Sequence, residues 1–186
     1  VPTVTALHVA KATRLPMRAV ESVEVEAGKG IVGDRYHGTK HRHVTVQSQD
    51  DLDTASGIHG SEVRAELTRR NVTISGGPVP REPGARLRIG PVLMEVVRVA
   101  APCKLLDDTI GRGAQEALRR RGGSVCRVLE GGRLAVDRQR HHPDRAGRRR
   151  PGPRPTVGHR LGAVGAGPVL GARRAGAVLP ACRGHL

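Results

Sequence analysis

The residue best suited to covalent or metal chemistry in this sequence is Cys103, which stands in VVRVAAPCKLLDD (residues 96–108). A valine-rich run ends at Pro102, so the cysteine follows an expected strand end, where loops often line binding sites. A thiolate is a nucleophile and a ligand for soft metals, and the neighbouring Lys104 favours that ionised form. The alternative is a small core residue, because free cysteine is among the most buried residue types. The local pattern leaves both interpretations of Cys103 open.

A second polar cluster lies in GIVGDRYHGTKHRHVTV (residues 30–46), which contains His37, His41 and His43. On an extended chain His41 and His43 share one face, a spacing that suits a metal ion. The glycines of this stretch indicate a loop, but no GK[ST] follows them, so it is not a Walker-type phosphate loop. We favour a solvated loop that leads into a strand over a metal site.

The stretch RRNVTISGG (residues 69–77) places two arginines, Arg69 and Arg70, between an expected helix and a strand. Arginine at a helix C-terminus commonly complements the helix dipole. The same side chain also donates paired hydrogen bonds to a phosphate. Asn71 fits a turn residue whose amide bonds the local backbone. This spacing alone does not decide between a structural role and phosphate binding.

The elements that must position these residues are short and mostly β-like. Residues 22–26 alternate between valine and polar side chains, as a half-buried strand does. The pairs Gly90-Pro91 and Gly131-Gly132 separate strand-like runs and predict hairpin turns. Short strands with few helices predict a mainly β fold, a closed or half-closed barrel. The strands are expected at residues 4–10, 19–28, 43–48, 71–76, 85–90, 92–100, 124–131 and 133–137.

Helical patterns are fewer. SQDDLDTAS (residues 48–56) predicts one helix, and a second helical segment at residues 61–70 opens on Ser61 as an N-cap. RGAQEALRRR (residues 112–121) predicts another helix, which Gly122-Gly123 ends. We therefore expect the helices to flank the β-structure.

Composition narrows the class of protein. With no Phe, no Trp and one Tyr, the core must be built from Val, Leu, Ile and Ala, which suits sheets. No run of 18 apolar residues predicts a membrane span, and the N-terminus lacks the pattern of a secretory signal. Three separated cysteines do not form a disulfide framework, which predicts a reducing, cytoplasmic location. Cys126, within the strand-like SVCRVLE, is expected in the core.

The formal net charge of +15 is spread unevenly. Residues 138–186 hold eleven arginines and one acid, and 33 of these 49 residues are Ala, Gly, Pro or Arg. Such a segment buries too little apolar surface to offset its ordering entropy, so we expect a domain at residues 1–137 and a disordered tail at 138–186. Out-of-frame translation of a GC-rich gene is a second interpretation, which we favour slightly over a plain solvated tail because the codons of Ala, Gly, Pro and Arg can consist of G and C alone. Non-specific nucleic-acid binding through the arginines is a third, weakened by the lack of interleaved aromatic residues.

Six motifs in their order resemble the MOSC domain, the C-terminal domain of molybdenum cofactor sulfurases, which also forms small stand-alone bacterial proteins. The resemblance runs from about Val20 to Asp137 and implies a β-barrel with a few flanking helices. This chain departs from the family pattern in two places. After LAVD the family usually continues with a closing segment, whereas this chain has RQRHHPD. The stretch SGGPVPREPG also differs from the linker that usually joins the strands on either side of it. The motifs are GIVGDRYHG, RHVTVQSQDDLD, RRNVTISG, GARLRIGPVLMEVVRV, APCKLLDD and GRGAQEALRRRGGSVCRVLEGGRLAVD.

The resemblance also implies a site. Cys103 matches the cysteine thought to hold molybdenum or carry sulfur, so it is the expected catalytic residue and metal ligand. RRNVTISG resembles a segment that contacts the pterin phosphate in amidoxime-reducing members, which makes Arg69 and Asn71 cofactor contacts. RHVTVQS adds Arg42 and Ser48 more loosely. The implied molybdenum cofactor agrees with these residue types, because its phosphate suits arginine and its metal suits a thiolate.

Three functions follow as expectations. The first is a molybdenum-cofactor-binding protein, an oxidoreductase for N-hydroxylated compounds that draws electrons from a separate electron-donor protein. The second is a non-catalytic sulfur or cofactor carrier, in which a sulfur-donating desulfurase loads a persulfide on Cys103. The third is a nucleic-acid-binding module that uses the basic tail. No pyridoxal phosphate is expected, because that cofactor belongs to a desulfurase domain for which this chain has no room. No membrane partner is expected.

Overall fold

The structure, a computed structural model, describes residues 2–137. The predicted tail at residues 138–186 lies outside the described residues, so its disorder and the domain boundary at Asp137 stay predictions. None of the helices within residues 2–137 has the length and hydropathy of a membrane span. The described part contains β-strands, three short α-helices and one 3₁₀ helix, and the predicted mainly β fold is confirmed.

The strands form two open sheets. The larger sheet has the order β2-β1-β6-β5-β9-β8-β7, and the smaller sheet has the order β10-β3-β4. The larger sheet consists of β1 (Thr3–Val9), β2 (Arg18–Val20), β5 (Val44–Ser48), β6 (Val72–Ser75), β7 (Arg86–Ile89), β8 (Val92–Val99) and β9 (Ser124–Glu130). The smaller sheet consists of β3 (Ser22–Glu26), β4 (Gly30–Ile31) and β10 (Gly132–Ala135).

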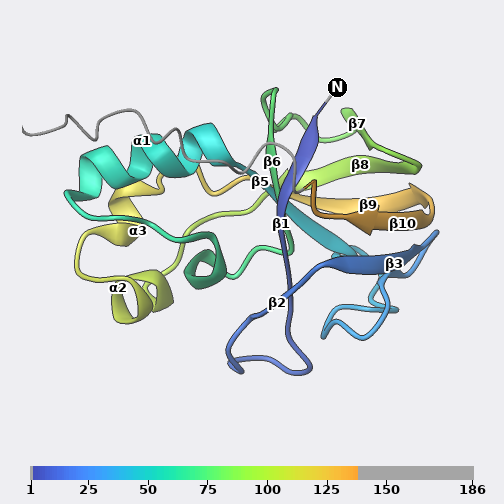
Figure 1. Cartoon of the computed structure of the whole chain (residues 1–186), viewed down its shortest axis with the longest axis horizontal. Helices are drawn as coiled ribbons and strands as arrows, with labels where there is room; N and C mark the ends of the chain where they lie inside the picture. The colour runs from blue at the N-terminus through green and yellow to red at the C-terminus, as the bar shows by residue number, and fades with distance from the viewer. Residues whose placement is uncertain (1, 138–186) are drawn as a thin grey trace, which may run out of the picture. The chain divides into compact units, whose positions relative to one another are not determined.

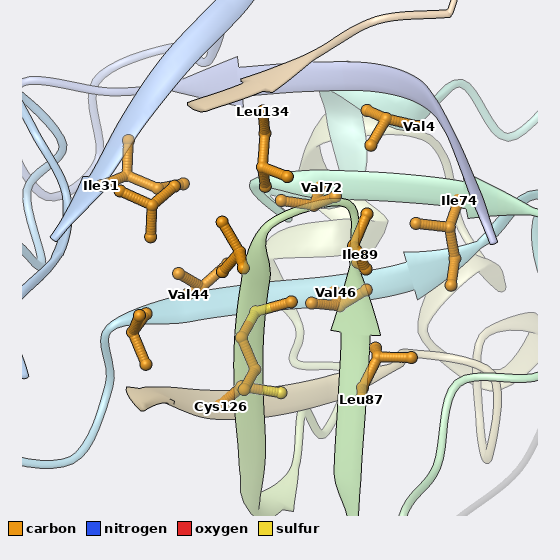
Figure 2. Close-up of a cluster of buried hydrophobic side chains, with 14 of the residues drawn as sticks. Val4, Ile31, Val44, Val46, Val72, Ile74, Leu87, Ile89, Cys126 and Leu134 are labelled. Atoms are coloured by element: carbon orange, nitrogen blue, oxygen red, sulfur yellow. The ribbon is translucent and has the colours of Figure 1, made fainter. Parts of the chain in front are cut away.

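The main hydrophobic core contains residues of both sheets. Figure 2 shows Ile31 and Leu134 of the smaller sheet in one cluster with Val44, Val46 and Val72 of the larger sheet. Burying each such aliphatic side chain contributes about 1.5–3 kcal/mol, and the chain has almost no aromatic residue to do so. The core is therefore built from branched aliphatic side chains, as the composition predicts.

Cys126 belongs to this core. Its side chain lies on β9 with 0% exposure, in the same cluster (Figure 2). Burial raises the pKa of the Cys126 thiol to about 12, because the thiolate is not solvated there. The prediction that this cysteine is a core residue is confirmed.

The helices gather beside one end of the larger sheet (Figure 1). They are α1 (Gln49–His59), η1 (Ala65–Thr68, a 3₁₀ helix), α2 (Leu105–Thr109) and α3 (Ala114–Ala117). Their buried side chains, Leu52, Leu106 and Ala117 among them, form a second apolar cluster. Strands β5 and β6 are paired in parallel, and the connection between them contains α1 and η1.

Two helix predictions are wrong in extent. Residues 61–70 form only η1, which begins at Ala65 with Arg64 at its N-cap position, so Ser61 caps no helix; the Ser61 Oγ instead bonds to Nδ1 of His59 at 2.8 Å. Residues 112–121 shorten to α3, after which Arg120 adopts a left-handed conformation (φ 63°). The short helix α2 was not predicted. In residues 61–70 and 112–121, packing against neighbouring elements overrides the helical propensity of the sequence.

One of the two predicted hairpins is wrong. Gly90-Pro91 does connect the antiparallel pair β7–β8. At Gly131-Gly132, however, the chain leaves β9 in the larger sheet and enters β10, which pairs with β3 in the smaller one. A Cβ on Gly131 would lie 2.4 Å from the Val25 carbonyl oxygen, so the glycine allows a close backbone approach between the sheets.

Candidate functional site

A cavity of about 330 Å³ lies where four loops meet, and we call it the arginine cavity. The loops are β1–β2, β4–β5, η1–β6 and β8–α2. No carboxylate is among the lining residues. The cavity is lined by Cys103, by Tyr36 and by the arginines Arg14, Arg35, Arg42, Arg69 and Arg70, together with Thr13, Thr68, Ala101, Leu105 and Leu106.

Cys103 sits at the start of α2. Strand β8 ends at Val99, and the Cys103 carbonyl accepts a hydrogen bond from the Leu106 amide at 2.9 Å. The side chain is an exposed, free thiol. Cys103 thus follows a strand end as predicted, and it is not the small core residue that the alternative interpretation required.

Arg70 holds the strand end that leads to this cysteine. Its residue is 7% exposed, and its guanidinium donates to the carbonyls of Gly122 (Nε, 2.7 Å) and Ala100 (Nη2, 2.8 Å). The pKa of Arg70 is lowered to about 10, mainly because burial disfavours its charge and next because Arg42 repels it, while Cys103 acts in the opposite direction. Arg70 therefore brings buried positive charge to the cavity wall.

Arg35 is a nearly buried cation with weak partners. Its side chain is 3% exposed, and its Nε has no hydrogen-bond partner among residues 2–137. Nη1 contacts the Met17 sulfur at 2.8 Å, and a thioether is a weak acceptor. Nη2 donates to the Arg69 carbonyl at 3.4 Å, a long hydrogen bond, and the Asp34 carboxylate lies 3.9 Å away, at the limit of an ion pair. A buried guanidinium so poorly partnered favours an added anion.

Tyr36, the only aromatic residue of the chain, lies between these arginines in sequence and in space. Its ring centroid is 4.0 Å from the Arg42 guanidinium carbon and 4.7 Å from that of Arg35. The Nε of Arg42 is also buried without a partner among the described residues. Burial is the main cause that lowers the pKa of Arg42. Stacking on one ring thus orients two cations whose donors are not all used.

Arg69 is a further arginine in the lining of the arginine cavity. It adopts a left-handed conformation (φ 62°) after η1, and its Nη1 donates to the Leu15 carbonyl at 3.0 Å. Its pKa is lowered, chiefly by burial and next by the nearby Arg35. Arg14 (φ 71°) also has positive φ, which is uncommon for a non-glycine residue. Unfavourable backbone conformations of this kind are concentrated at functional sites.

Two of the predicted contacts lie outside the cavity lining. Asn71 is 1% exposed: its Oδ1 accepts from the amide and hydroxyl of Thr45, and its Nδ2 donates to the His8 carbonyl and to Asp34. The Asn71 side chain thus holds the loop that carries Asp34. Ser48 is buried at the end of β5, before α1.

The structure therefore brings together three of the five predicted residues, Cys103, Arg42 and Arg69. The arginine cavity also contains residues that were not assigned from the sequence, namely Arg14, Arg35, Tyr36 and Arg70. Weak local signals existed for two of these arginines. Arg70 directly follows Arg69, and Arg35 lies in the glycine-rich stretch that leads to Arg42.

The histidines of residues 30–46 are separated by burial. His43 is buried and its Nδ1 accepts from the Val128 amide at 2.9 Å, whereas His41 is exposed. His37 contacts the Glu26 carboxylate at 3.3 Å. Within residues 2–137 no group of three His, Cys, Asp or Glu side chains is arranged to hold a metal ion.

Residues 33–139 match a family model described as the MOSC domain. The matched range covers more than half of the chain and includes Cys103 and four of the five cavity arginines. The chain belongs to the MOSC domain family. A search of curated protein sequences found no match.

Solved structures support the fold of this MOSC protein. The YuaD protein of Bacillus subtilis is similar with a TM-score of 0.64 and 16% identity, over 73% of this chain and 92% of that one. YiiM of Geobacillus stearothermophilus has a TM-score of 0.57 and 17% identity, over 73% and 71% of the two chains. At such identities the similarity shows the fold alone.

Proposed function

We propose that this MOSC protein binds a molybdenum cofactor in the arginine cavity. The arginines would hold the phosphate of the cofactor, and Cys103 would be the protein ligand of the metal. One observation carries the proposal: five arginines and an exposed free thiol line one cavity that contains no carboxylate. A phosphate is favoured there because guanidinium groups form short, paired, charge-assisted hydrogen bonds with it.

The residues present fit that group. The buried Nε atoms of Arg35 and Arg42 are donors without a partner among residues 2–137, and phosphate oxygens are acceptors. An anion would also offset the burial that lowers the pKa of Arg42, Arg69 and Arg70. At the same wall, Cys103 supplies the soft sulfur donor that a molybdenum centre prefers.

Bound in this way, the cofactor supplies two-electron redox chemistry, and the chain supplies binding and position. Arg70 fixes the carbonyls that precede Cys103, and Tyr36 orients two of the phosphate-binding guanidiniums. We propose reduction of N-hydroxylated compounds as the activity, with electrons from a separate electron-donor protein. A free thiol at the site requires a reducing compartment, so we place the protein in the cytoplasm.

The exposure of Cys103 supports a second candidate, a sulfur carrier. The Cys103 thiolate would attack the outer sulfur of a persulfide on a desulfurase. The Cys103 persulfide forms as the sulfur–sulfur bond of the donor breaks, and the donor leaves as a thiolate. The arginines that line the cavity would lie beside the transferred sulfur.

Metal analysis of the purified full chain tests the leading proposal. We expect close to one molybdenum per chain, with pterin fluorescence after oxidative release of the cofactor. Sulfane sulfur on Cys103 without molybdenum or pterin would favour the carrier. Protein isolated from molybdenum-replete cells with neither metal, pterin nor sulfane sulfur would contradict both candidates.

A further inference from the structure

A second cavity, of about 240 Å³, lies between β1, α1 and residues 62–66. It shares no lining residue with the arginine cavity. Nothing in the proposed cofactor site uses it. Its volume is several times the roughly 30 Å³ that one water occupies in the liquid, so it has room for a small organic molecule.

The lining of this cavity is acidic although the chain carries +15. Three carboxylates, those of Asp53, Glu62 and Glu66, line it. The only cationic side chain in the lining is Arg64, which pairs with Glu66 at 2.9 Å. The Gln49 amide donates to Asp53 at 2.9 Å. The sign of the local charge therefore opposes that of the whole protein, and it favours a cation.

His8 makes the cavity more than an acidic surface cluster. This residue is 4% exposed and lines the cavity from β1. Its Nδ1 is buried without a hydrogen-bond partner among residues 2–137. The pKa of His8 is lowered, because burial outweighs the attraction of Glu66, so the ring is held neutral. A neutral imidazole has one nitrogen with a free lone pair, which accepts a hydrogen bond.

We propose that this acidic cavity binds an organic ammonium ion, whose N–H groups bond to His8 and to the carboxylates of Glu62 and Glu66. An ammonium group is a compact donor of three hydrogen bonds and matches a lining of acceptors. A metal ion fits less well, because within residues 2–137 no group of three ligating side chains is arranged to hold one. An anion is repelled by the three carboxylates.

Calorimetric titration of the full chain with 1,4-diaminobutane tests the proposal, with 1,4-butanediol as the neutral probe of the same length. We expect saturable one-site binding of the diamine and none of the diol. Non-specific binding of the diamine is disfavoured, because the net charge of +15 repels cations. Absence of diamine binding at millimolar concentration, or equal binding of the diol, would overturn the proposal.

The double variant Glu62→Gln, Glu66→Gln locates the binding. It keeps the side-chain size and removes two charges, so we expect diamine affinity to fall about ten-fold or more. Glu95→Gln, Glu130→Gln is the matched control: these acids pair with arginines on the sheet and do not line the cavity. The control should retain affinity within about two-fold. Equal losses in both double variants would show general charge effects and contradict the site.

Nitrogen NMR of the labelled wild-type protein reports on His8 itself. We expect the His8 ring nitrogen signals to shift as the diamine saturates, while those of His43 stay constant, because His43 does not line the cavity. Diamine binding that leaves the His8 signals unchanged would remove His8 from the site. None of these readouts depends on molybdenum, so the ammonium site and the proposed cofactor function succeed or fail separately.

Discussion

Two cysteines of this chain show how position decides the chemistry of one residue type. Cys126 is enclosed by aliphatic side chains, and its thiol has a pKa raised to about 12. Cys103 is exposed beside a row of guanidiniums. Burial disfavours a thiolate at the first position, whereas the second position is open to solvent. Of the two cysteines within residues 2–137, Cys103 alone is accessible to a metal or a substrate.

Substituting Cys103 by serine separates these roles. A hydroxyl is nearly isosteric with a thiol, but it is a hard, weakly acidic donor that does not replace a thiolate on a soft metal. We expect Cys103→Ser to keep the unfolding temperature of the wild type and to lose metal-linked activity, measured by thermal unfolding and by assays on purified protein. Cys126→Ser is the control, because it buries a hydroxyl and should cost about 1–3 kcal/mol of stability. Equal molybdenum content and activity in Cys103→Ser and wild type would contradict the site.

Arg35 is predicted to contribute to binding at the expense of stability. Replacing a buried, poorly paired charge by an apolar side chain of similar length is often neutral or stabilising, by about 1–4 kcal/mol. We expect Arg35→Met to unfold at the same or a higher temperature and to bind inorganic phosphate about ten-fold more weakly. Calorimetry measures the phosphate affinity, and thermal unfolding measures the stability. A destabilised variant with unchanged phosphate affinity would show that Arg35 is structural.

Two buried histidines predict a loss of stability in acid. The folded-state pKa values of His8 and His43 lie below the ordinary 6.5, mainly because of burial. Below about pH 6.5 the unfolded chain binds protons that the folded chain does not, so the free energy of unfolding falls as pH drops through the folded-state pKa values. Thermal unfolding between about pH 8 and pH 5 measures this. His43→Gln, which keeps an acceptor for the Val128 amide, should flatten the slope; a slope equal to that of the wild type would exclude His43 as a cause.

At the scale of elements, glycines allow strands and loops to approach more closely than side chains permit. Gly122 lies against the carbonyl of Ala100 and beside Arg70, where a Cβ would be 2.3 Å from the Ala100 oxygen. Gly123 has φ of 75°, and a Cβ there would meet the Val46 backbone. The glycine pair, interpreted from sequence as a helix stop, instead lets Arg70 reach the loop that carries Cys103.

Gly123→Ala is therefore expected to be strongly destabilising. The left-handed φ and the backbone contact both oppose a Cβ, and we expect a loss of more than about 2 kcal/mol, measured by denaturant unfolding. Gly57→Ala is the matched control, because Gly57 lies within α1, is exposed, and has open space at the Cβ position. That change should stabilise the protein by up to about 1 kcal/mol through helix propensity. Similar effects of the two substitutions would refute the packing argument.

At the scale of the whole molecule, charge is divided between sites of opposite sign. The arginine cavity has no carboxylate in its lining, whereas the acidic cavity beside His8 has three. The chain also carries eleven arginines in residues 138–186, outside the described part. Non-specific attraction of polyanions follows net charge, whereas cofactor phosphate binding needs the local geometry of the cavity.

Removing residues 138–186 should separate these two effects. Hydrogen bonds join residues 136 and 137 to the domain. The amide of Val136 donates to the backbone carbonyl of Glu21, and the amide of Asp137 donates to that of Val4, each at 2.9 Å. We expect a chain of residues 1–137 to fold, to keep its phosphate affinity and to lose most of its retention on heparin. Loss of phosphate binding or of folding on truncation would mean that the domain extends beyond Asp137.

The sequence alone determined most of the strands, the end of β8 before Cys103 and the aliphatic core, because alternation and turn residues act over a few neighbouring positions. It missed the two-residue strand β4, and it joined β2 and β3, which lie in different sheets, into one strand at residues 19–28. The motif resemblance added Arg42 and Arg69. Only the tertiary structure decided that Asn71 is used internally, that β10 joins β3, and that Arg35 and Arg70 converge on the same cavity. Those features depend on contacts between residues far apart in the chain, which no local pattern specifies. The burial of His8 in an acidic lining has the same origin: it follows from α1 and residues 62–66 packing over β1.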